Sequence, residues 1–317
     1  MIAYGVDLGA THVRAARVEI RGERARIVRH ARGKVGVRRD PDRVVEIIAR
    51  VLGRVGALQG RAPIAVAAAA QLSADGRIVR NSPNLGWRDA PLHDLLRQRL
   101  GRPALIENDI NAAAVGEARF GAGQGSAHVF VALLGSGLGN GLVLDGKLYR
   151  GATWVAGEFG HVKVRGPRGR LCGCGQRGCL EAYVGGVKFA ERVREELARG
   201  ADSSLQALFR RDPGAISVAA VERAAHLQGD AYARRRWREA ADMFGTALAN
   251  AVSTLNPERV VLGGGVLLHC PELYHHAARL CCERSLTVAG DAVRVVRAAL
   301  GDDAGVFGAA ALAAESR

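Results

Sequence analysis

The sequence predicts an α/β protein made of two domains of the same design. The chain has 317 residues, which suits two domains of ordinary size and is enough to bury a core in each. Residues 2–33 read as strand, glycine turn, strand, tight turn, strand, and residues 127–149 repeat this order without repeating its letters. The later segments are mostly helical patterns. We therefore expect two α/β domains that face each other.

Each later element has its own local signal. A helix begins at Asp40-Pro41, because a capping residue is followed there by proline at the first helical position. Apolar runs and amphipathic spacing predict a strand, a helix and a strand over residues 63–70, 91–100 and 103–109. The same criteria predict a buried strand over 258–266 and helices over 181–199, 217–228, 231–255 and 303–315. No low-complexity linker separates the halves, so we expect a hinge between them.

Composition excludes several classes of protein. Hydrophobic residues make up 48% and charged residues 24%, as in ordinary globular proteins. No apolar run reaches about 18 residues, so no membrane helix is expected. The N-terminus has neither the basic start nor the apolar block of a secretory signal, and the cytoplasm is the expected compartment.

The formal net charge of +14 raises the question of a nucleic-acid partner. Only four lysines are present, so the basic charge is almost all arginine, and it is scattered along the chain. The densest run, residues 233–239, reads as the solvated face of a long helix. We therefore expect no nucleic-acid partner.

Six cysteines fall into two groups. Cys172, Cys174 and Cys179 form C-x-C and C-x4-C, and His161 precedes the first of them by eleven residues. Three thiolates and one imidazole are a usual ligand set of structural zinc. An iron–sulfur cluster would want a fourth cysteine, and the compartment disfavours a disulfide. We predict Zn²⁺ with His161 as fourth ligand, and unliganded thiols are the alternative. Buried free thiols are expected at Cys270, Cys281 and Cys282.

Two carboxylates lie close to this metal loop in the sequence. Glu158 is three residues before His161, and Glu181 is two after Cys179. The loop would therefore position both, and the alternative for both is surface salt bridging. Three thiolates on Zn²⁺ leave one excess negative charge. Four arginines are close in the sequence: Arg165, Arg168, Arg170 and Arg177. They either offset this charge or form a solvated basic loop.

Strand-to-strand turns rich in glycine and small hydroxyls are predicted at residues 7–14 and 135–141, and a further run of glycines is found at residues 263–265. Backbone N–H groups that glycine leaves bare can cradle phosphate oxygens, and Thr11 or Ser136 would add a hydroxyl donor. Asp7, at the end of its strand, would hold phosphate-bound magnesium through water. Plain hairpin turns are the alternative. The chain has no Walker A pattern, and its one G-x-G-x-x-G lies inside the cysteine cluster, so we reject a dinucleotide fingerprint.

Three polar residues, Glu107, Asn108 and Asp109, come together where a strand ends and a helix begins. A helix cap needs only one of them, although a cap is the simplest reading of Asn108 or Asp109. A carboxylate at this place can also accept a proton from an attacking hydroxyl, and Asn or Asp can grip sugar hydroxyls. The segment NSPNLGW would add Asn84 and a stacking surface on Trp87, unless it is only a Pro-Asn turn.

Taken together, the motifs of this chain resemble those of the ROK family (repressors, open reading frames, kinases), and most of all its bacterial ATP-dependent glucokinases. The motifs occur in the family's order along essentially the whole chain: DLGATHVR, SPNLGW, ENDINAAAVGEARFGAG, GEFGHVKV, CGCGQRGCLEAY and NPERVVLGGGV. The resemblance implies the fold of actin and sugar kinases, with two ribonuclease-H-like domains around a central cleft. It places the small domain at residues 1–111, joined by the C-terminal helix 300–317, and the large domain at 112–299.

The resemblance also implies a role for each candidate residue. Asp109 matches the base that takes the proton from the sugar 6-hydroxyl. The sugar would be held by Asn84, Asn108, Asp109, Glu158, His161 and Glu181. ATP and its Mg²⁺ would be held by Asp7, Gly9, Thr11, Gly135, Ser136, Gly137, Gly263 and Gly264. Zinc would use His161, Cys172, Cys174 and Cys179.

We therefore expect a kinase of carbohydrate metabolism that converts glucose and ATP into glucose 6-phosphate, and that is a homodimer or homotetramer. The alternatives are another hexose (N-acetylglucosamine, mannose or fructose), a sugar-sensing regulator without turnover, and polyphosphate as donor. No helix-turn-helix precedes Asp7, so a repressor is not expected. Ala10 and Ala70 stand where the family usually has Gly, and Ser136 where it often has Thr. The Ala10 methyl would crowd a phosphate, and Ala70 would alter the fit of the sugar.

Overall fold

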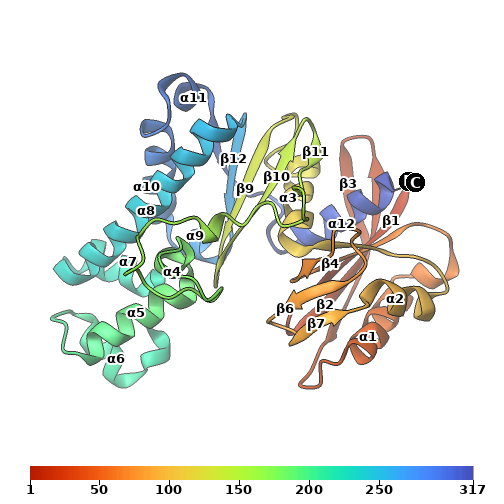
Figure 1. The fold of residues 1–317 in the computed structure, drawn as a ribbon, viewed down its shortest axis with the longest axis horizontal. Coiled ribbons are helices and arrows are strands. Elements are labelled where there is room, and N and C mark those ends of the chain that lie inside the picture. The colour runs from red at the N-terminus through yellow and green to blue at the C-terminus, as the bar shows by residue number, and fades with distance from the viewer. Residues whose placement is uncertain (317) are drawn as a thin grey trace. The chain divides into compact units, whose positions relative to one another are not determined.

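The computed structural model describes residues 1–316 and divides into two compact units. The first unit comprises Met1–Val131, Gly141–Gly157 and the chain from Ala298 onward, and the second comprises Ala132–Asn140 and Glu158–Arg297. Figure 1 traces the chain by colour from red to blue. The compact units change over at residues other than the predicted domain boundary near residue 111. That boundary stays a prediction.

The first sheet has the strand order β3-β2-β1-β4-β8. Its strands are β1 (Ile2–Leu8), β2 (His12–Arg21), β3 (Arg24–Lys34), β4 (Ile64–Ala68) and β8 (Leu105–Asn108). The short turns after β1 and β2 make β1, β2 and β3 antiparallel neighbours, as predicted. β1 pairs with β4, and β4 with β8, in parallel.

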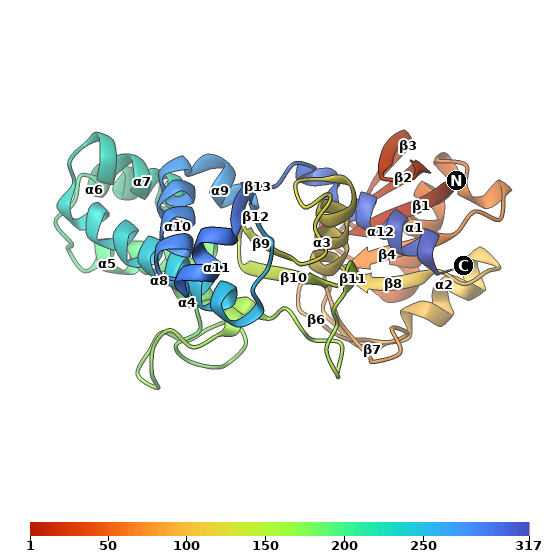
Figure 2. The same ribbon diagram turned by 90° about the horizontal axis from the view of Figure 1, so that it is seen from above.

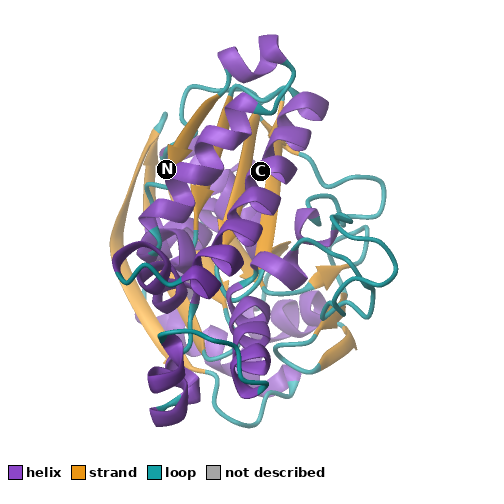
Figure 3. Cartoon of the chain, turned by 90° about the vertical axis from the view of Figure 1, so that its left-hand side faces the viewer, coloured by secondary structure: helices purple, strands orange, loops and turns teal. Residues whose placement is uncertain are grey.

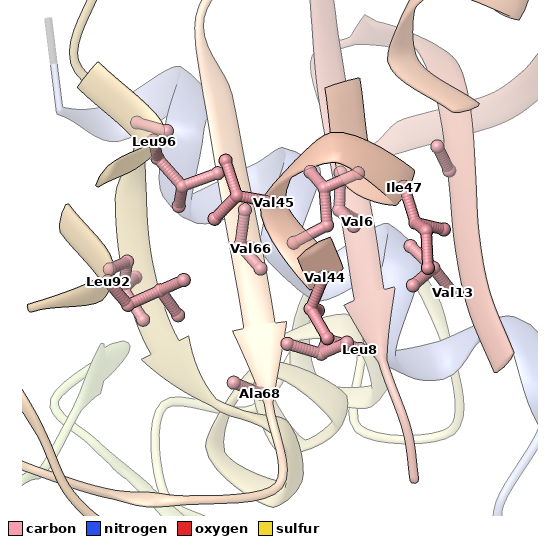
Figure 4. Packing of buried hydrophobic residues seen from close by; sticks show 14 of the residues in the cluster. Val6, Leu8, Val13, Val44, Val45, Ile47, Val66, Ala68, Leu92 and Leu96 are labelled. Carbon is pink, nitrogen blue, oxygen red and sulfur yellow. The ribbon is translucent and has the colours of Figure 1, made fainter. Parts of the chain in front are cut away.

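Alternating side chains of the first sheet enter two different cores. Val6, Leu8 and Val66 point toward α1 (Pro41–Arg54) and α2 (Leu92–Leu100), where branched side chains fill the space (Figure 4). The opposite face carries small residues such as Ala65 and Ala67, and it packs on α3 (Asp109–Phe120) and α12 (Ala304–Glu315). A small sheet within the same unit contains β5 (Gln71–Leu72), β6 (Val79–Ser82) and β7 (Trp87–Ala90).

The second sheet repeats the arrangement of the first. Its order is β11-β10-β9-β12-β13, so again the third, second, first, fourth and fifth strands follow one another. The strands are β9 (Val129–Leu134), β10 (Leu138–Leu144), β11 (Lys147–Leu148), β12 (Arg259–Gly263) and β13 (Arg294–Arg297). The shared order confirms the prediction of two α/β halves of the same design.

Helices make up most of the chain after residue 180. Figure 3 distinguishes the helices of the chain, in purple, from its strands, in orange. α8 packs against both α7 and α10 (Figure 2). The helices are α4 (Glu181–Val184), α5 (Gly186–Ala198), α6 (Leu205–Arg211), α7 (Val218–Leu227), α8 (Ala231–Leu255), α9 (Gly265–His269), α10 (Pro271–Glu283) and α11 (Thr287–Ala292). Within residues 1–316, none of the helices is both long and apolar enough to cross a membrane.

Three local expectations differ from the structure. The glycine-rich segment after β9 turns over fewer residues than predicted, because β10 already begins at Leu138. The helix predicted over 181–199 is interrupted at Gly185, whose extended backbone separates α4 from α5. Asp40 does occupy the N-cap of α1, but its side chain makes no capping hydrogen bond. Instead its carbonyl accepts the Val44 N–H at 3.1 Å.

Candidate active site and metal centre

The start of α3 carries the acidic motif at the end of β8. Asn108 is the N-cap, and its side-chain oxygen accepts the N–H groups of Ile110 at 2.9 Å and Asn111 at 3.0 Å. Its amide nitrogen donates to the carbonyl of Ala70 at 3.1 Å. Asn108 therefore caps the helix, which leaves the neighbouring Asp109 available for another role.

Asp109 is partly buried at the N-terminus of α3. Burial, and next the negative charge of Asp7, raise the pKa of Asp109 from its ordinary value of 3.8 to about 6. The Ile110 N–H, which Asp109 accepts at 2.9 Å, opposes this shift only in part. A carboxylate that titrates close to neutral pH is suited to act as a general base.

Asp7 lies at the end of β1, beside the first glycine turn. Burial raises the pKa of Asp7, while the guanidinium of Arg14, with Nε 3.4 Å from Oδ2, lowers it. Because the negative charge of Asp7 disfavours ionisation of Asp109, a cation bound near them would be stabilised. Thr11 in the adjoining turn is exposed, and the Gly9 N–H donates to the carbonyl of His12 at 3.0 Å.

Glu107 is a residue whose role the sequence did not indicate. Its side chain is only 1% exposed and accepts the Nε–H of Arg150 at 2.7 Å. It also accepts the Asn108 N–H and the Asn111 side chain, both at 3.0 Å. The one signal in the sequence was its place among three polar residues at the end of a strand, and it gave no hint of the partner.

Two further expectations about the first unit change. The stacking surface predicted on Trp87 is wrong, because the indole is 4% exposed in the core and its Nε1–H donates to the Arg39 carbonyl. Asn84, three residues earlier, is exposed. Ala10 is not among the described non-glycine residues with positive φ, so an alanine forms this turn without backbone strain.

The second unit brings the predicted zinc ligands together. The donor atoms of His161, Cys172, Cys174 and Cys179 all lie within 4.8 Å of one another. The sulfurs of Cys174 and Cys179 are 3.7 Å apart, and His161 Nδ1 is 3.6 Å from Cys172 Sγ. Tetrahedral zinc with ordinary bond lengths would separate two sulfurs by about 3.8 Å and a sulfur and a nitrogen by about 3.6 Å. The four residues therefore fit a structural zinc ion.

A positive charge beside this cluster comes from a residue that the sequence did not single out as its partner. The ammonium of Lys163 is 3.0 Å from the sulfur of Cys179. Two of the arginines that were weighed either as offsetting charges or as a solvated loop pair with carboxylates: Arg165 is 3.6 Å from Glu239, and Arg170 is 3.0 Å from Glu195. The compact lysine ammonium can approach a thiolate closely, which explains its place here.

The two predicted carboxylates take different positions beside the metal centre. Glu158 Oε2 is 3.6 Å from His161 Nε2, the ring nitrogen that faces away from Cys172. Glu181 Oε2 accepts the Leu138 N–H at 3.0 Å, and a side chain at Gly137 would overlap this carboxylate. Glu181 thus ties the metal loop to the second glycine turn.

The second glycine turn borders a cavity of about 460 Å³ within the second unit. The carbonyls of Gly135 and Ser136 accept the first N–H groups of α5, at 2.9 and 3.0 Å. The third glycine cluster adjoins the same turn, because Gly264, with φ of +91°, lies against the carbonyl of Leu134. The walls of the cavity are mainly apolar and include Val187, Ala190, Ile216 and Val266.

Comparison with known proteins agrees with these features. The model of the ROK family matches residues 3–316. The chain belongs to the ROK family. Glucokinase from Streptomyces coelicolor is 36% identical over 322 residues, covering 99% of this chain and 98% of that protein. N-acetyl-D-glucosamine kinase from Photobacterium profundum is 30% identical over 318 residues, covering 98% of each.

A solved structure extends the likeness to the fold. It is a ROK family glucokinase from Streptomyces griseus in complex with glucose and AMPPNP. It has a TM-score of 0.78 and 33% identity, and the match covers 99% of this chain and all of that one. The ROK chain therefore has the predicted actin- and hexokinase-like α/β fold, and the full-length relatives named above are sugar kinases.

The predicted site residues of this ROK chain fall in both units. The first unit contains Asp7, Gly9, Thr11, Asn84, Asn108 and Asp109. The second contains Gly135, Ser136, Gly137, Glu158, His161, Glu181, Gly263, Gly264 and the three clustered cysteines. Within the first unit Asn108, Asp109 and Asp7 are linked by contact or charge, and within the second Glu158 and Glu181 lie beside the Cys/His cluster that contains His161.

Proposed function

We propose that this chain is an ATP-dependent kinase that phosphorylates glucose at its 6-hydroxyl. The observation that carries the proposal is Asp109, a carboxylate with a pKa near 6 at the N-terminus of α3. Its neighbour Asn108 already caps the helix, so this carboxylate is free to act as a base. The similarity to glucokinases along the whole chain favours glucose as the acceptor.

In the proposed reaction the sugar 6-hydroxyl gives its proton to Asp109. The sugar oxygen forms a bond to the γ-phosphorus as the bond from that phosphorus to the β–γ bridging oxygen breaks, and ADP leaves. Phosphoryl transfer depends mainly on positioning and on charge stabilisation. Asn108, Glu158, His161 and Glu181 would orient the sugar. Asn84 would add an amide from its exposed turn.

The nucleotide would use the glycine turns and the apolar cavity of the second unit. A methyl group at Gly135 would meet nothing within 4 Å, and one at Gly9 would be 3.5 Å from the nearest atom. The protein's own packing therefore does not require glycine at either place, whereas a closely approaching phosphate would. The walls around Val187 and Val266 would take the nucleoside.

Two metal ions would support the reaction. Asp7 would hold the phosphate-bound magnesium through water, and magnesium would offset phosphate charge. His161, Cys172, Cys174 and Cys179 would hold zinc, which would cross-link the metal loop. With Nδ1 on the side of the cluster, His161 keeps Nε2 on the side of Glu158, where a sugar hydroxyl would bind.

The direct test is to replace Asp109 by asparagine. Asp109→Asn keeps the shape of the side chain but cannot accept the proton, so we expect kcat to fall at least roughly 100-fold. Steady-state kinetics with glucose and ATP measure the loss. Asp94→Asn, on the surface of α2, is the matched control and should retain wild-type kcat. Turnover of Asp109→Asn within about tenfold of wild type would refute the assignment of the base.

A different hexose is the second candidate, because a full-length relative is an N-acetyl-D-glucosamine kinase. Comparing kcat/KM for glucose, N-acetylglucosamine, mannose and fructose decides between them. An assay of sugar-dependent ADP release separates a kinase from a sugar-sensing regulator, which would bind sugar without forming ADP. Assembly as a homodimer or homotetramer stays a prediction, and light scattering of the purified chain measures it.

A further inference from the structure

The carboxylate of Glu107 is a buried junction directly beside the proposed base. It accepts three donors: the Asn108 N–H, the Asn111 side-chain amide and the Arg150 guanidinium. Asn108 precedes Asp109 and Asn111 lies one half-turn after it, so both sides of Asp109 are fixed to one carboxylate. Since Asn111 is 4% exposed and Glu107 is 1% exposed, water cannot replace a lost partner cheaply.

Arg150 is the one charged partner of this junction among the described contacts. Arg150 belongs to the segment 149–157 and is 43 residues from Glu107 along the chain. This segment closes on itself, because the Ala156 N–H donates to the Arg150 carbonyl at 3.0 Å. This bond ties the backbone of Arg150 into its own loop.

Trp154 is a second partner of the guanidinium. The Arg150 Cζ is 4.7 Å from the centre of the Trp154 ring. The backbone of Trp154 has a φ of +62°, a conformation that costs energy for a bulky residue and persists only when its surroundings enforce it. The ring lies against Gly76, where a Cβ would come within 3.0 Å of it. The strained tryptophan thus packs against Gly76 and contacts the guanidinium of Arg150.

From these contacts we infer that Arg150 is a positioning residue for the reaction. Arg150 is held by Trp154 and fixes the carboxylate of Glu107. Glu107 in turn fixes the start of α3, which presents Asp109. The inference rests on the proposed function for its kinetic readout. A displacement of about 1 Å at a catalytic group can cost 100-fold in rate, so such a contact matters even without touching substrate.

The kinetic test compares Arg150→Met, Arg150→Lys and the matched control Arg99→Met. Arg99 pairs with Glu46 on the surface of the same unit, away from α3. We expect Arg150→Met to lower kcat roughly 100-fold while the KM for sugar stays within about threefold. Arg150→Lys keeps the charge beside Glu107 but not the planar donor, so its kcat should fall only about tenfold. Arg99→Met should match wild type.

Trp154→Gly tests the contact between the Trp154 ring and Arg150, because glycine accepts the positive φ while the ring is lost. We expect it to lower kcat about tenfold, and to add nothing further when combined with Arg150→Met, because both changes act through the same contact. Independent, additive losses would show that Trp154 does not act through Arg150.

A readout without turnover keeps the inference separate from the proposed function. In Arg150→Met, amide hydrogen exchange at Ile110 and Asn111 should accelerate while residues 112–119 of α3 exchange as in wild type. If wild type phosphorylates no sugar, the proposed function fails and the exchange data still decide the positioning role. Unchanged exchange at Ile110 and Asn111, a uniform acceleration along α3, or kcat of Arg150→Met within about threefold of wild type would overturn it. If Arg150→Met does not fold, Arg150→Lys with kcat within about threefold of wild type overturns it.

Discussion

Asp109 is kept in an environment that favours its protonated form. The folded state raises its pKa from 3.8 to about 6, mainly by burial and then by the charge of Asp7. Ionising this carboxylate at neutral pH therefore costs the folded protein roughly 3 kcal/mol, as an order of magnitude. The raised pKa that suits Asp109 to accept a proton near neutral pH also lowers the stability of the folded protein. Such a conflict between activity and stability is common at active sites.

The first prediction at this scale is the pH dependence of catalysis. Because Asp109 must be ionised to accept a proton, kcat/KM should rise with pH through a midpoint near 6 and then level off. The profile is measured at saturating ATP between roughly pH 5 and 8. A profile that is flat across this range would show that another group is the base.

The second prediction concerns stability. The folded pKa of Asp109 is raised, so the stability of wild type falls as pH rises from about 4 to about 6, and the full cost remains above that range. Asp109→Asn removes this cost. Its melting temperature should exceed that of wild type clearly at pH 8 and much less at pH 4.5, as measured by thermal unfolding. An equal difference at both pH values would contradict the cause given for the shift.

Residues that depend on distant partners were those that the sequence could not assign. The capping role of Asn108 and the donor set of the metal centre follow from local spacing, and both are found. Glu107 was visible only as a polar residue, because its partner Arg150 is 43 residues away. Trp87 looked like a stacking surface because its turn is polar, but it is buried in the core, and its indole N–H donates to the Arg39 carbonyl from another segment.

At the scale of elements, glycines bring α12 into close contact with its neighbours. A Cβ at Gly308 would overlap the carbonyl oxygen of Ala112 on α3, and one at Gly5 would overlap that of Val306 on α12. Sequence patterns predicted the C-terminal helix, but these approaches are tertiary and have no local signal. α12 covers the small-residue face of the first sheet, the same face on which α3 lies.

The third prediction tests this packing. Gly308→Ala places a methyl group against backbone that cannot yield, so it should lower the free energy of unfolding by about 2 kcal/mol or more. Gly53→Ala in α1 is the matched control, since its methyl would make only an ordinary contact of 3.5 Å with Leu58. There the better helix propensity of alanine should stabilise the protein by up to about 1 kcal/mol. Chemical denaturation measures both, and a loss in Gly53→Ala as large as in Gly308→Ala would contradict the packing argument.

At the scale of the whole molecule, repetition was the most readable signal. The strand–turn–strand pattern occurs twice in the sequence, and the strand order occurs twice in the structure. Local periodicity can reveal a repeat because each strand and tight turn is encoded by neighbouring residues. The short strands β5, β6 and β7 were not predicted, because two to four residues are too few for a periodic pattern.

The four candidate zinc ligands lie within residues 161–179, so a bound ion would cross-link this stretch of the chain. Cys174 is exposed, and Cys174→Ser therefore removes a zinc ligand with little change in packing. We expect the variant to lose zinc, to melt at a lower temperature, and to show a KM for sugar raised about tenfold, since Glu158, His161 and Glu181 lose their anchor. Metal analysis, thermal unfolding and kinetics measure the three effects.

Cys282→Ser, outside the cluster, is the control and should keep all three at wild-type values. If Cys174→Ser lost zinc but kept the wild-type KM, the link from the metal centre to the sugar would be wrong.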